Sequence, residues 1–145
     1  MISFETSRFG RLEVQKDKVI HFQNGLIGFP DIKRFILMDY KDTSLKWLQA
    51  VDDPDVAFIV MAPYEHFPEY SLRLDNATKK ILDIVNEEDV VIFTMVRVDG
   101  DNVTANLQGP LVINSINKKG MQVVVDDNRF SCRTPLPAAP PQAAK

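Results

Sequence analysis

Hydrophobic and polar residues alternate strictly along residues 103–108, so that the apolar side chains share one face of an extended chain. Gly109 and Pro110 then interrupt the pattern, because proline has no amide hydrogen to donate and glycine permits a sharp bend. Residues 111–113 are apolar on both faces, as in a strand that is covered on both sides. The pattern therefore predicts two strands joined by a corner within one strongly curved sheet.

Short runs of the same kind recur along the chain, and they are rich in valine, isoleucine and phenylalanine. Glycine, proline, asparagine and aspartate separate the runs, as is typical of turns. The further predicted strands are residues 11–15, 18–22, 35–40, 46–51, 56–62, 70–74, 90–98, 121–125 and 130–133. This spacing favours an all-β fold, either an antiparallel β-barrel-like domain or a strongly curved sandwich, over alternating βαβ units.

One short helix is predicted within residues 75–86. Asp75 is suited to cap its first turn, and apolar residues follow at helical spacing. These residues are Ala77, Ile81, Ile84 and Val85. We expect the helix to lie across one mouth of the barrel and to bury this stripe. A second helical turn is expected at residues 30–34, where a proline occupies the first position.

The chain is predicted to form a single domain over residues 1–136. Its length of 145 residues is that of one domain with a substantial core. Residues 137–145 are rich in proline and alanine and hold no core-forming residue, so we expect a disordered tail there. The single cysteine excludes an intramolecular disulfide and a cysteine-rich metal site. Without a signal peptide or a long apolar run, the sequence predicts a cytoplasmic protein that does not enter a membrane.

Acidic residues cluster between the predicted strands, and the net charge is −3. The clusters include Asp52, Asp53 and Asp55 in one turn and Glu87, Glu88 and Asp89 in another. Aspartate often serves turn geometry by bonding its own backbone. Taken together, however, the clusters would form an acidic rim that repels nucleic acid and attracts a basic protein. We therefore expect no direct binding of RNA or DNA.

Catalytic constellations are scarce in this sequence. His21 lies in a predicted strand, and His66 lies in a loop between Glu65 and Phe67. An enzyme that uses His66 with Glu65 or Glu69 stays open as an alternative, and it would require these groups to converge. No metal-binding, nucleotide-binding or nucleophile motif accompanies either histidine, so we expect no enzymatic activity, no cofactor and no metal.

Recognition of a partner is the chemistry that the sequence favours. Residues 63–70 combine three aromatic residues with two prolines, which keep the segment extended and outside the sheet. Its aromatic residues either fold back onto the core or form an exposed anchor for a partner, with Phe67 and Tyr70 as the candidates. The same question applies to Phe29, in a glycine-rich turn from which neighbouring apolar residues cannot all point inward. Asn106, beside the corner, is either a backbone anchor of the bend or a contact residue.

Several short motifs resemble, in order and spacing, those of the flagellar assembly factor FliW family. The corner run over residues 104–114 is the central motif, and the others span most of residues 2–136. They are Thr6-Ser7-Arg8-Phe9-Gly10, residues 20–29, Trp47-Leu48-Gln49, Phe67-Pro68-Glu69-Tyr70, residues 120–124 and Arg133-Thr134-Pro135-Leu136. Glu69 and Gly109 stand where the family pattern has an aspartate and an alanine.

The resemblance implies a non-enzymatic protein of flagellar assembly. Members of the family bind the translational regulator CsrA and relieve its repression of flagellin synthesis, and they also bind flagellin, so that the two partners exchange. The acidic turns are suited to the basic surface of an RNA-binding regulator, and exposed apolar loops are suited to the amphipathic helices of flagellin. We expect a monomer. The alternative function is a β-barrel that carries a small ligand in its interior.

Overall fold

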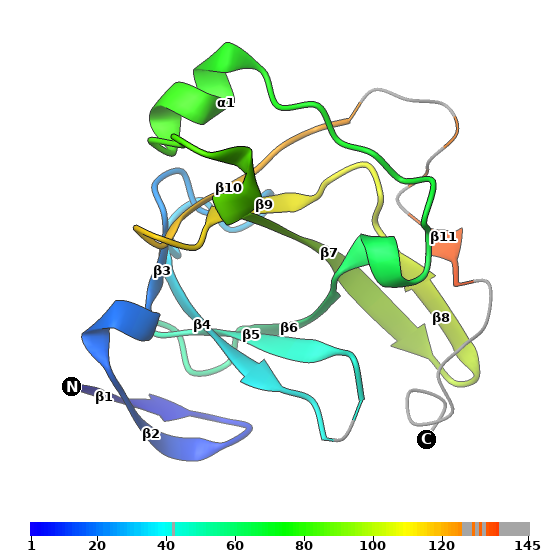
Figure 1. The fold of residues 1–145 in the computed structure, drawn as a ribbon. Helices are drawn as coiled ribbons and strands as arrows, with labels where there is room; N and C mark the ends of the chain where they lie inside the picture. Colours follow the sequence, from blue (N-terminus) through cyan, green and yellow to red (C-terminus); the bar gives the residue numbers. More distant parts are fainter. Residues whose placement is uncertain (42, 126–128, 130, 132, 137–145) are drawn as a thin grey trace.

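The architecture is given by a computed structural model that describes residues 1–41, 43–125, 129, 131 and 133–136. The described chain is built mainly of strands, with a single α-helix and short 3₁₀ turns (Figure 1). The strands are β1 (Ile2–Thr6), β2 (Gly10–Val14), β3 (Ile20–Phe22), β4 (Arg34–Asp39), β5 (Lys46–Ala50), β6 (Ala57–Met61), β7 (Val90–Asp99), β8 (Asn102–Ala105), β9 (Leu111–Asn114), β10 (Lys119–Gln122) and β11 (Thr134–Pro135). The helical elements are η1 (Lys16–Lys18), η2 (Pro63–Glu65), α1 (Asn76–Ile81) and η3 (Glu87–Asp89).

Seven of these strands form a closed barrel in the order β7-β6-β5-β4-β3-β10-β9, and β9 returns to β7. Each neighbouring pair is antiparallel except β10 and β3, which run parallel. Closure removes most of the free edges that an open sheet of this size would expose. The predicted all-β, mostly antiparallel barrel with one short helix is therefore confirmed, and the sandwich alternative is wrong.

The corner predicted at Gly109 and Pro110 explains how the barrel closes. β8 and β9 both pair with β7, β8 with its carboxyl-terminal half and β9 with its amino-terminal half. The side-chain oxygen of Asn106 accepts the amides of Gln108 and Gly109, at 3.1 Å each. The chain thus leaves β7 after β8, bends, and rejoins the same strand as β9.

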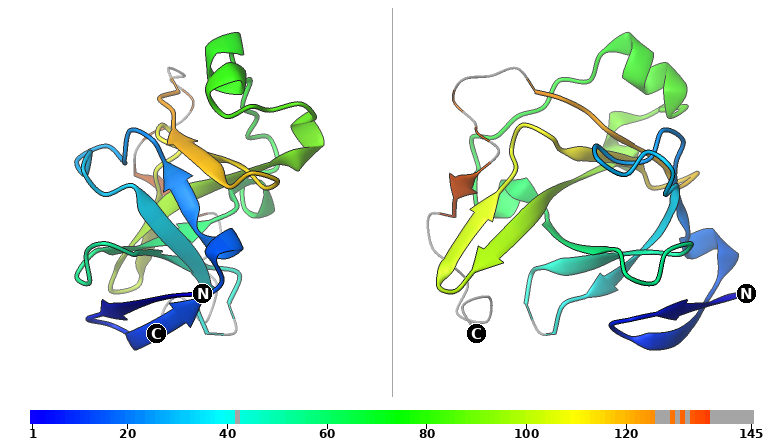
Figure 2. Two further views of the ribbon diagram at one scale, coloured as in Figure 1. Left: turned by 90° about the vertical axis from the view of Figure 1, so that its left-hand side faces the viewer. Right: turned by 180° about the vertical axis from the view of Figure 1, so that it is seen from behind.

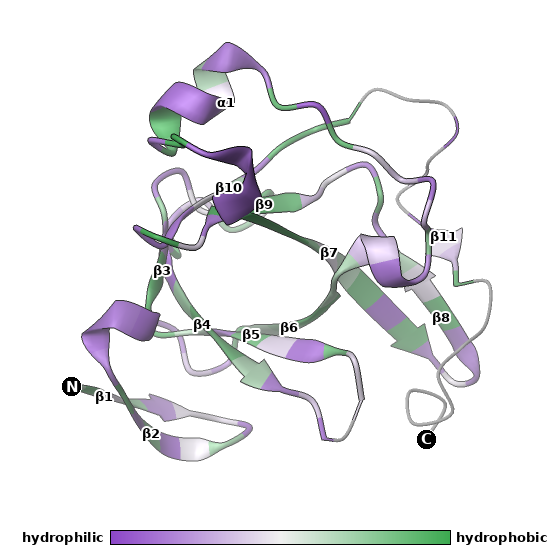
Figure 3. Ribbon diagram, in the orientation of Figure 1, coloured by the Kyte–Doolittle hydropathy of each residue, from purple (hydrophilic) through white to green (hydrophobic). Residues whose placement is uncertain are grey.

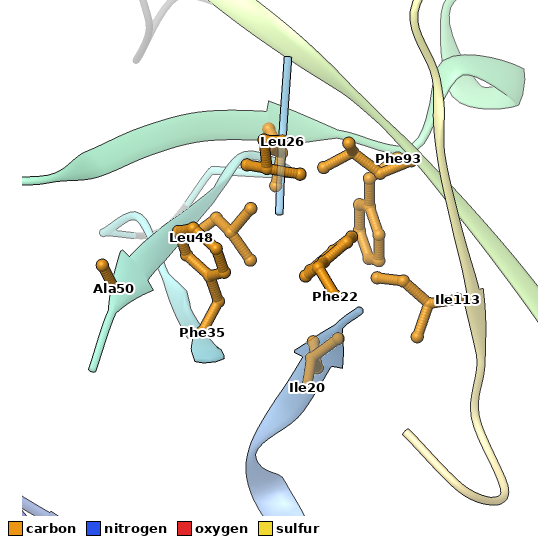
Figure 4. Packing of buried hydrophobic residues seen from close by; sticks show 10 residues of the cluster. Ile20, Phe22, Leu26, Phe35, Leu48, Ala50, Phe93 and Ile113 are labelled. Atoms are coloured by element: carbon orange, nitrogen blue, oxygen red, sulfur yellow. The ribbon is translucent and has the colours of Figure 1, made fainter. Parts of the chain in front are cut away.

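Aromatic and branched side chains fill the centre of the barrel. Phe22, Phe35 and Phe93 converge there from three strands, and Leu26 enters from the loop after β3 (Figure 4). The rings of Phe22 and Phe35 meet edge to face, with centroids 5.6 Å apart. In Figure 3 the first half of β7 and β9 are drawn in the hydrophobic colour, in agreement with strands that are apolar on successive positions.

Two smaller cores lie outside the barrel. One forms between β1, β2 and the outer side of the barrel, where Phe4 and Leu12 pack against Val19 and Ile36. This hairpin lies outside the ring of strands (Figure 2), and its first strand, β1, was absent from the strands predicted from sequence. The other core gathers β6, the second half of β7, β8, the segment after η2 and Leu136.

The helix is present, but its expected packing is wrong. Asp75 caps α1, because its carboxylate accepts the amide of Thr78 at 2.7 Å, and this bond lowers the pKa of Asp75. Of the predicted stripe, however, Val85 is 89% exposed and Ile81 is also exposed. Thr78 and Leu82 are the buried residues instead. The helix is too short to present a full apolar face.

Two predicted elements do not form. Residues 70–74 adopt an extended conformation without joining a strand, and residues 30–34 form turns and the start of β4 rather than a helical turn. The predicted strand over 130–133 includes residues outside the described part of the chain, and β11 follows it. The predicted tail, 137–145, also lies outside the described residues. Among the described helices, none has the length and apolar character needed to cross a membrane.

Candidate protein-binding surfaces

Phe67 and Tyr70 belong to the core rather than to a docking surface. Phe67 is 5% exposed and Tyr70 is 1% exposed, and both pack with Met61 and Leu107. The Tyr70 hydroxyl donates a hydrogen bond to the Leu107 carbonyl at 2.8 Å. Burial, with a smaller contribution from Tyr64, raises the pKa of Tyr70 to about 12. The prediction that these two residues form an exposed aromatic anchor is therefore wrong.

The glycine-rich loop after β3 presents apolar side chains to solvent. Leu26 points into the barrel, whereas Ile27 is 65% exposed and Phe29 is 37% exposed. Gly25 has a φ of +66°, and a Cβ there would lie 2.4 Å from the Phe29 carbonyl oxygen, so only glycine fits this turn. The ring of Phe29 rests on Phe58 with centroids 5.3 Å apart. We call Ile27 and Phe29 the Ile27–Phe29 patch.

A side chain from β10 fixes this loop against the barrel corner. The Gln122 side-chain oxygen accepts the amide of Ile27 at 2.8 Å, while its nitrogen donates to the Gly109 carbonyl at 2.9 Å. A Cβ at Gly109 would lie 2.9 Å from the Gln122 nitrogen and 3.0 Å from the Asn106 nitrogen. Gly109 therefore leaves room for both amides. Asn106 holds the bend, so its observed contacts are those of a backbone anchor.

The acidic turn at Asp52, Asp53 and Asp55 is occupied by structural contacts. Arg34 donates to both carboxylate oxygens of Asp52, one at 2.9 Å, and this bond lowers the pKa of Asp52. The Asp53 carboxylate accepts the amide of Asp55 at 3.0 Å. Ser7, in the turn between β1 and β2, donates its hydroxyl to Asp55. The turn therefore attaches the hairpin to the barrel, and it still presents carboxylates to solvent.

The second acidic cluster lies elsewhere on the molecule. Glu87 pairs with Lys79 of α1 at 2.9 Å, and this contact lowers the pKa of Glu87. Glu88 is exposed, and the Asp89 carbonyl accepts the amide of Ser115 at 2.9 Å. This cluster comes directly before the first residue of β7. The Asp52–Asp55 turn comes before β6, and β6 begins beside the carboxyl-terminal half of β7, where Ile59 pairs with Val96. The two clusters therefore lie near opposite ends of β7 and do not join each other.

Trp47 forms a half-buried surface cluster instead of entering the core. Phe9 meets it edge to face at 5.6 Å, and Tyr40 lies 5.3 Å away. The guanidinium of Arg8 stands 4.5 Å from the Trp47 ring centroid, in cation–π geometry. The cluster joins the hairpin turn to β5. Its members are far apart in sequence, so the sequence pattern alone gave no signal for it.

The described residues do not assemble the alternative catalytic constellation. His66 is half-buried, and its Nε2 atom has no hydrogen-bond partner in the described part of the chain. Glu65 and Glu69, the carboxylates considered for it, are exposed and form no ion pair with it. No group of three or more histidine, cysteine, aspartate or glutamate residues among those described could hold a metal ion.

The centre of the barrel leaves little space for a carried ligand, since Phe22, Phe35 and Leu48 are fully buried there. An open hollow of about 520 Å³ lies at the barrel mouth, where Ile20, Leu37 and Ile113 meet Lys18 and Lys46. A small amphiphile could contact this hollow only from outside. The interior-carrier alternative therefore has no enclosed site in the described structure.

A large concave surface lies beside the first half of β7, and we call it the β7 groove. It has a volume of about 890 Å³ and is open to solvent. One wall is Val90–Ile92, and the other is the extended segment at residues 72–74. Tyr64, Lys79 and Glu87 are also part of its lining. The sequence did not indicate this groove, although Pro63, which ends β6 beside it, was visible as a strand breaker.

Comparison with known proteins gives one consistent result. The family model described as FliW protein matches residues 3–136. The chain is 37% identical over 139 residues to a protein of Magnetococcus marinus, covering 93% of this chain and 85% of that one. It is 35% identical over 127 residues to a protein of Caldicellulosiruptor saccharolyticus, covering 86% and 84%. It is 37% identical over 131 residues to a protein of Treponema pallidum, covering 89% and 87%.

All three relatives are named flagellar assembly factor FliW. The fold is also similar to a crystal structure of the flagellar assembly factor FliW, with a TM-score of 0.85 at 32% sequence identity. That alignment covers 92% of this chain and 96% of the other. Sequence and fold therefore agree over nearly the whole length.

Proposed function

The chain belongs to the FliW family, and from this we propose that it is a non-enzymatic flagellar assembly factor of the cytoplasm. We further propose that it binds the translational regulator CsrA, so relieving repression of flagellin synthesis, and that it binds flagellin in exchange. The observation that carries the proposal is the match over residues 3–136 together with the fold similarity at a TM-score of 0.85. The filled barrel and the dispersed histidines and carboxylates support a binding role over catalysis.

We assign flagellin to the Ile27–Phe29 patch. Phe67 and Tyr70 are not part of this assignment, because both are buried. The assembly ends of flagellin are amphipathic helices, which bind through apolar anchors in a groove or on a patch. Ile27 and Phe29 are exposed, and the Gln122 bond and the Phe58 ring hold their loop in place. A loop that is already ordered loses little entropy when a partner docks.

CsrA is assigned to the acidic turns, because an RNA-binding regulator presents basic surface. Glu88 is the carboxylate to test, since the carboxylates of the Asp52–Asp55 turn and of Glu87 are engaged, with Arg34, the Asp55 amide, Ser7 and Lys79 as their partners. Charges at the edge of an interface act mainly on the association rate and are screened over about 10 Å at 0.1 M salt. Binding of CsrA should therefore weaken steeply with salt.

Titration calorimetry of purified CsrA and flagellin against matched variants tests the two assignments. Ile27→Ala with Phe29→Ala should weaken flagellin binding by about 2 kcal/mol, roughly thirtyfold, and leave CsrA binding unchanged. Ile116→Ala is the matched control, since Ile116 is similarly exposed but lies after β9. Glu88→Lys should impair CsrA binding alone, and Glu13→Lys on β2, which changes the net charge by the same amount, is its control.

The outcomes separate the parts of the proposal. Equal losses for both partners from the Ile27/Phe29 variant or from Glu88→Lys would mean one shared site, and the division of the surface would be wrong. Failure of the unsubstituted chain to bind either protein would refute the partner assignment itself. If the unsubstituted chain binds both proteins and neither variant changes either affinity, the contacts lie elsewhere on the molecule.

A further inference from the structure

The first half of β7 has one paired edge and one open edge. Backbone groups of alternate residues point to opposite sides of a strand. The Ser115 amide donates to the Asp89 carbonyl at 2.9 Å, and the same register places Val91 and Phe93 opposite Ile113 and Leu111. The odd-numbered residues of this half therefore face β9. The backbone groups of Val90 and Ile92 point to the opposite edge of β7. Farther along the strand, from Thr94 on, β6 pairs with this same edge.

Pro63 explains why β6 does not cover this edge. In the register that pairs Met61 with Thr94, Pro63 would fall opposite Ile92. Proline has no amide hydrogen to donate to the Ile92 carbonyl. The Pro63 carbonyl is itself occupied, because it accepts the amides of His66 at 3.2 Å and Phe67 at 2.8 Å. The chain leaves the sheet at this point and forms η2.

The backbone groups of β7 beyond the last pair with β6 have no partner in the described part of the chain. The Val90 amide donates to the Glu87 carbonyl, but the Val90 carbonyl and both backbone groups of Ile92 bond to no described residue. The segment at residues 72–74, on the opposite wall, also makes no backbone hydrogen bond to a described residue. It runs from η2 to α1 without joining the sheet (Figure 1). An uncovered strand edge is a template for another strand.

We propose that the β7 groove binds an extended peptide segment of a partner protein, which adds a strand to the open edge of β7. The groove volume of about 890 Å³ is within the range of ligand-binding clefts and accommodates a short extended peptide. The peptide should carry alternating apolar residues, which meet Tyr64, Leu72 and Leu74. It should also carry a carboxylate, because Arg73 lines the groove without an ion-pair partner among the described residues.

The chain's own tail is a poor occupant by the same chemistry. Residues 137–145 contain three prolines, which cannot donate to the open edge, and their one charged side chain is Lys145, of the same sign as Arg73. A second copy of this chain would pair the two β7 edges and form a dimer. This inference rests on the proposed function in one respect: it assumes that the chain binds other proteins, and it states how one of them is recognised.

Panning a phage-displayed library of random dodecapeptides on the full chain tests the proposal without assuming which protein is the partner. The enriched peptides should alternate apolar residues around an acid. A synthetic copy should slow exchange of the Ile92 amide by at least tenfold in hydrogen-exchange NMR. Arg73→Glu should weaken its binding about tenfold, while Arg11→Glu, at an arginine of β2 that is also exposed, should not.

A backbone variant isolates the open edge. Ile92→Pro removes the outward amide without removing a bond to β9, and it should abolish peptide binding, whereas Val91→Pro should disrupt the β9 ladder and lower the melting temperature. If Ile92→Pro fails to fold, Arg73→Glu and the Ile92 exchange rate still decide. The proposal is overturned if no peptide is enriched, or if enriched peptides bind without protecting Ile92.

Two further results would overturn it in favour of another occupant. Loss of Ile92 protection on truncation after Leu136 would identify the tail. A dimer that Ile92→Pro converts to a monomer would identify a second copy. Calorimetry with CsrA and flagellin is independent of these readouts. The proposed function can therefore stand when strand addition fails, and strand addition can stand when both proteins fail to bind.

Discussion

Tyr70 shows how a single hydroxyl decides the role of an aromatic segment. The residue is buried, and its hydroxyl satisfies the Leu107 carbonyl, which is itself fully buried beside the corner. A buried carbonyl without a donor costs free energy, so the tyrosine stabilises the fold in a way that phenylalanine cannot. Its neighbour Tyr64 is exposed and lines the β7 groove instead. Two tyrosines of one short segment thus have opposite roles.

We predict that Tyr70→Phe lowers the free energy of unfolding by about 2 kcal/mol at pH 7, because it leaves the Leu107 carbonyl unpaired. The pKa of Tyr70 is raised from 10.0 to about 12 by burial. Stability from the protonated hydroxyl is therefore complete below pH 10.0 and is lost as the pH rises to about 12. Tyr70→Phe should remove this part of the alkaline loss of stability.

Urea unfolding at neutral and alkaline pH measures both effects. Tyr40→Phe is the matched control, since it also deletes one hydroxyl, and that hydroxyl makes no hydrogen bond within the described residues. It should change stability by less than about 0.5 kcal/mol. An alkaline loss of stability as steep in Tyr70→Phe as in the unsubstituted chain would show that the Tyr70 hydroxyl is not its cause.

At the scale of elements, α1 depends on polar contacts more than on an apolar face. The Asn114 side chain, buried at the end of β9, donates to the Leu82 carbonyl at 2.9 Å. Its oxygen accepts the amide of Ile116 at 3.0 Å. Asn117 donates to the same Leu82 carbonyl at 3.0 Å from the surface. A helix of six residues is too short to be stable alone, so these bonds and Leu82 hold it in place.

We predict that Asn114→Ala lowers the free energy of unfolding by about 2 kcal/mol, because it removes a buried amide that bonds the Leu82 carbonyl and the Ile116 amide and leaves a cavity in its place. The Leu82 amide, which donates to the Thr78 carbonyl, should exchange faster as α1 loosens. Asn117→Ala removes a bond to the same carbonyl at an exposed position and should cost less than about 0.5 kcal/mol. Val85→Ala should have no effect.

Chemical denaturation combined with amide exchange decides whether the Asn114 hydrogen bonds or the apolar stripe hold α1 in place. If Val85→Ala destabilised the protein as much as Asn114→Ala, the apolar stripe would be the main anchor after all. If Asn114→Ala lowered stability without changing exchange at Leu82, the asparagine would serve β9 rather than α1.

At the scale of the whole molecule, Leu136 completes a core that is built from segments far apart in the sequence. β11 pairs with β8 through Thr134 and Ala105, and the Leu136 amide donates to the Val103 carbonyl at 3.1 Å. The Leu136 side chain is buried in the core that also contains Phe67 and Tyr70. The final described residues therefore cover a core that earlier segments leave incomplete.

We predict that truncation after Leu136 leaves the melting temperature unchanged, because the residues beyond it carry no apolar pattern. Truncation after Arg133 removes β11 and Leu136, and it should lower the melting temperature by roughly 10 °C. Differential scanning calorimetry of the two truncated chains makes the comparison directly. If truncation after Leu136 lowered the melting temperature by several degrees, residues 137–145 would have to contact the domain.

The sequence by itself determined the features that depend on local pattern. Strict alternation over residues 103–108, the break at Gly109 and Pro110, and the apolar run at 111–113 fix β8, the corner and β9 wherever the rest of the chain lies. The Asp75 cap is local as well, since it joins residues three positions apart. Family motifs spread over the chain likewise predicted the match that the comparisons confirm.

Only the tertiary structure decided which apolar and charged residues remain on the surface. Phe67 and Phe29 look alike in sequence, yet one is covered by β8 and Leu136 and the other rests at the barrel rim. The parallel pairing of β3 with β10 and the open edge of β7 arise from segments far apart in the chain. Burial is a property of such distant neighbours, and local periodicity shows which face of a strand is apolar without showing what covers it.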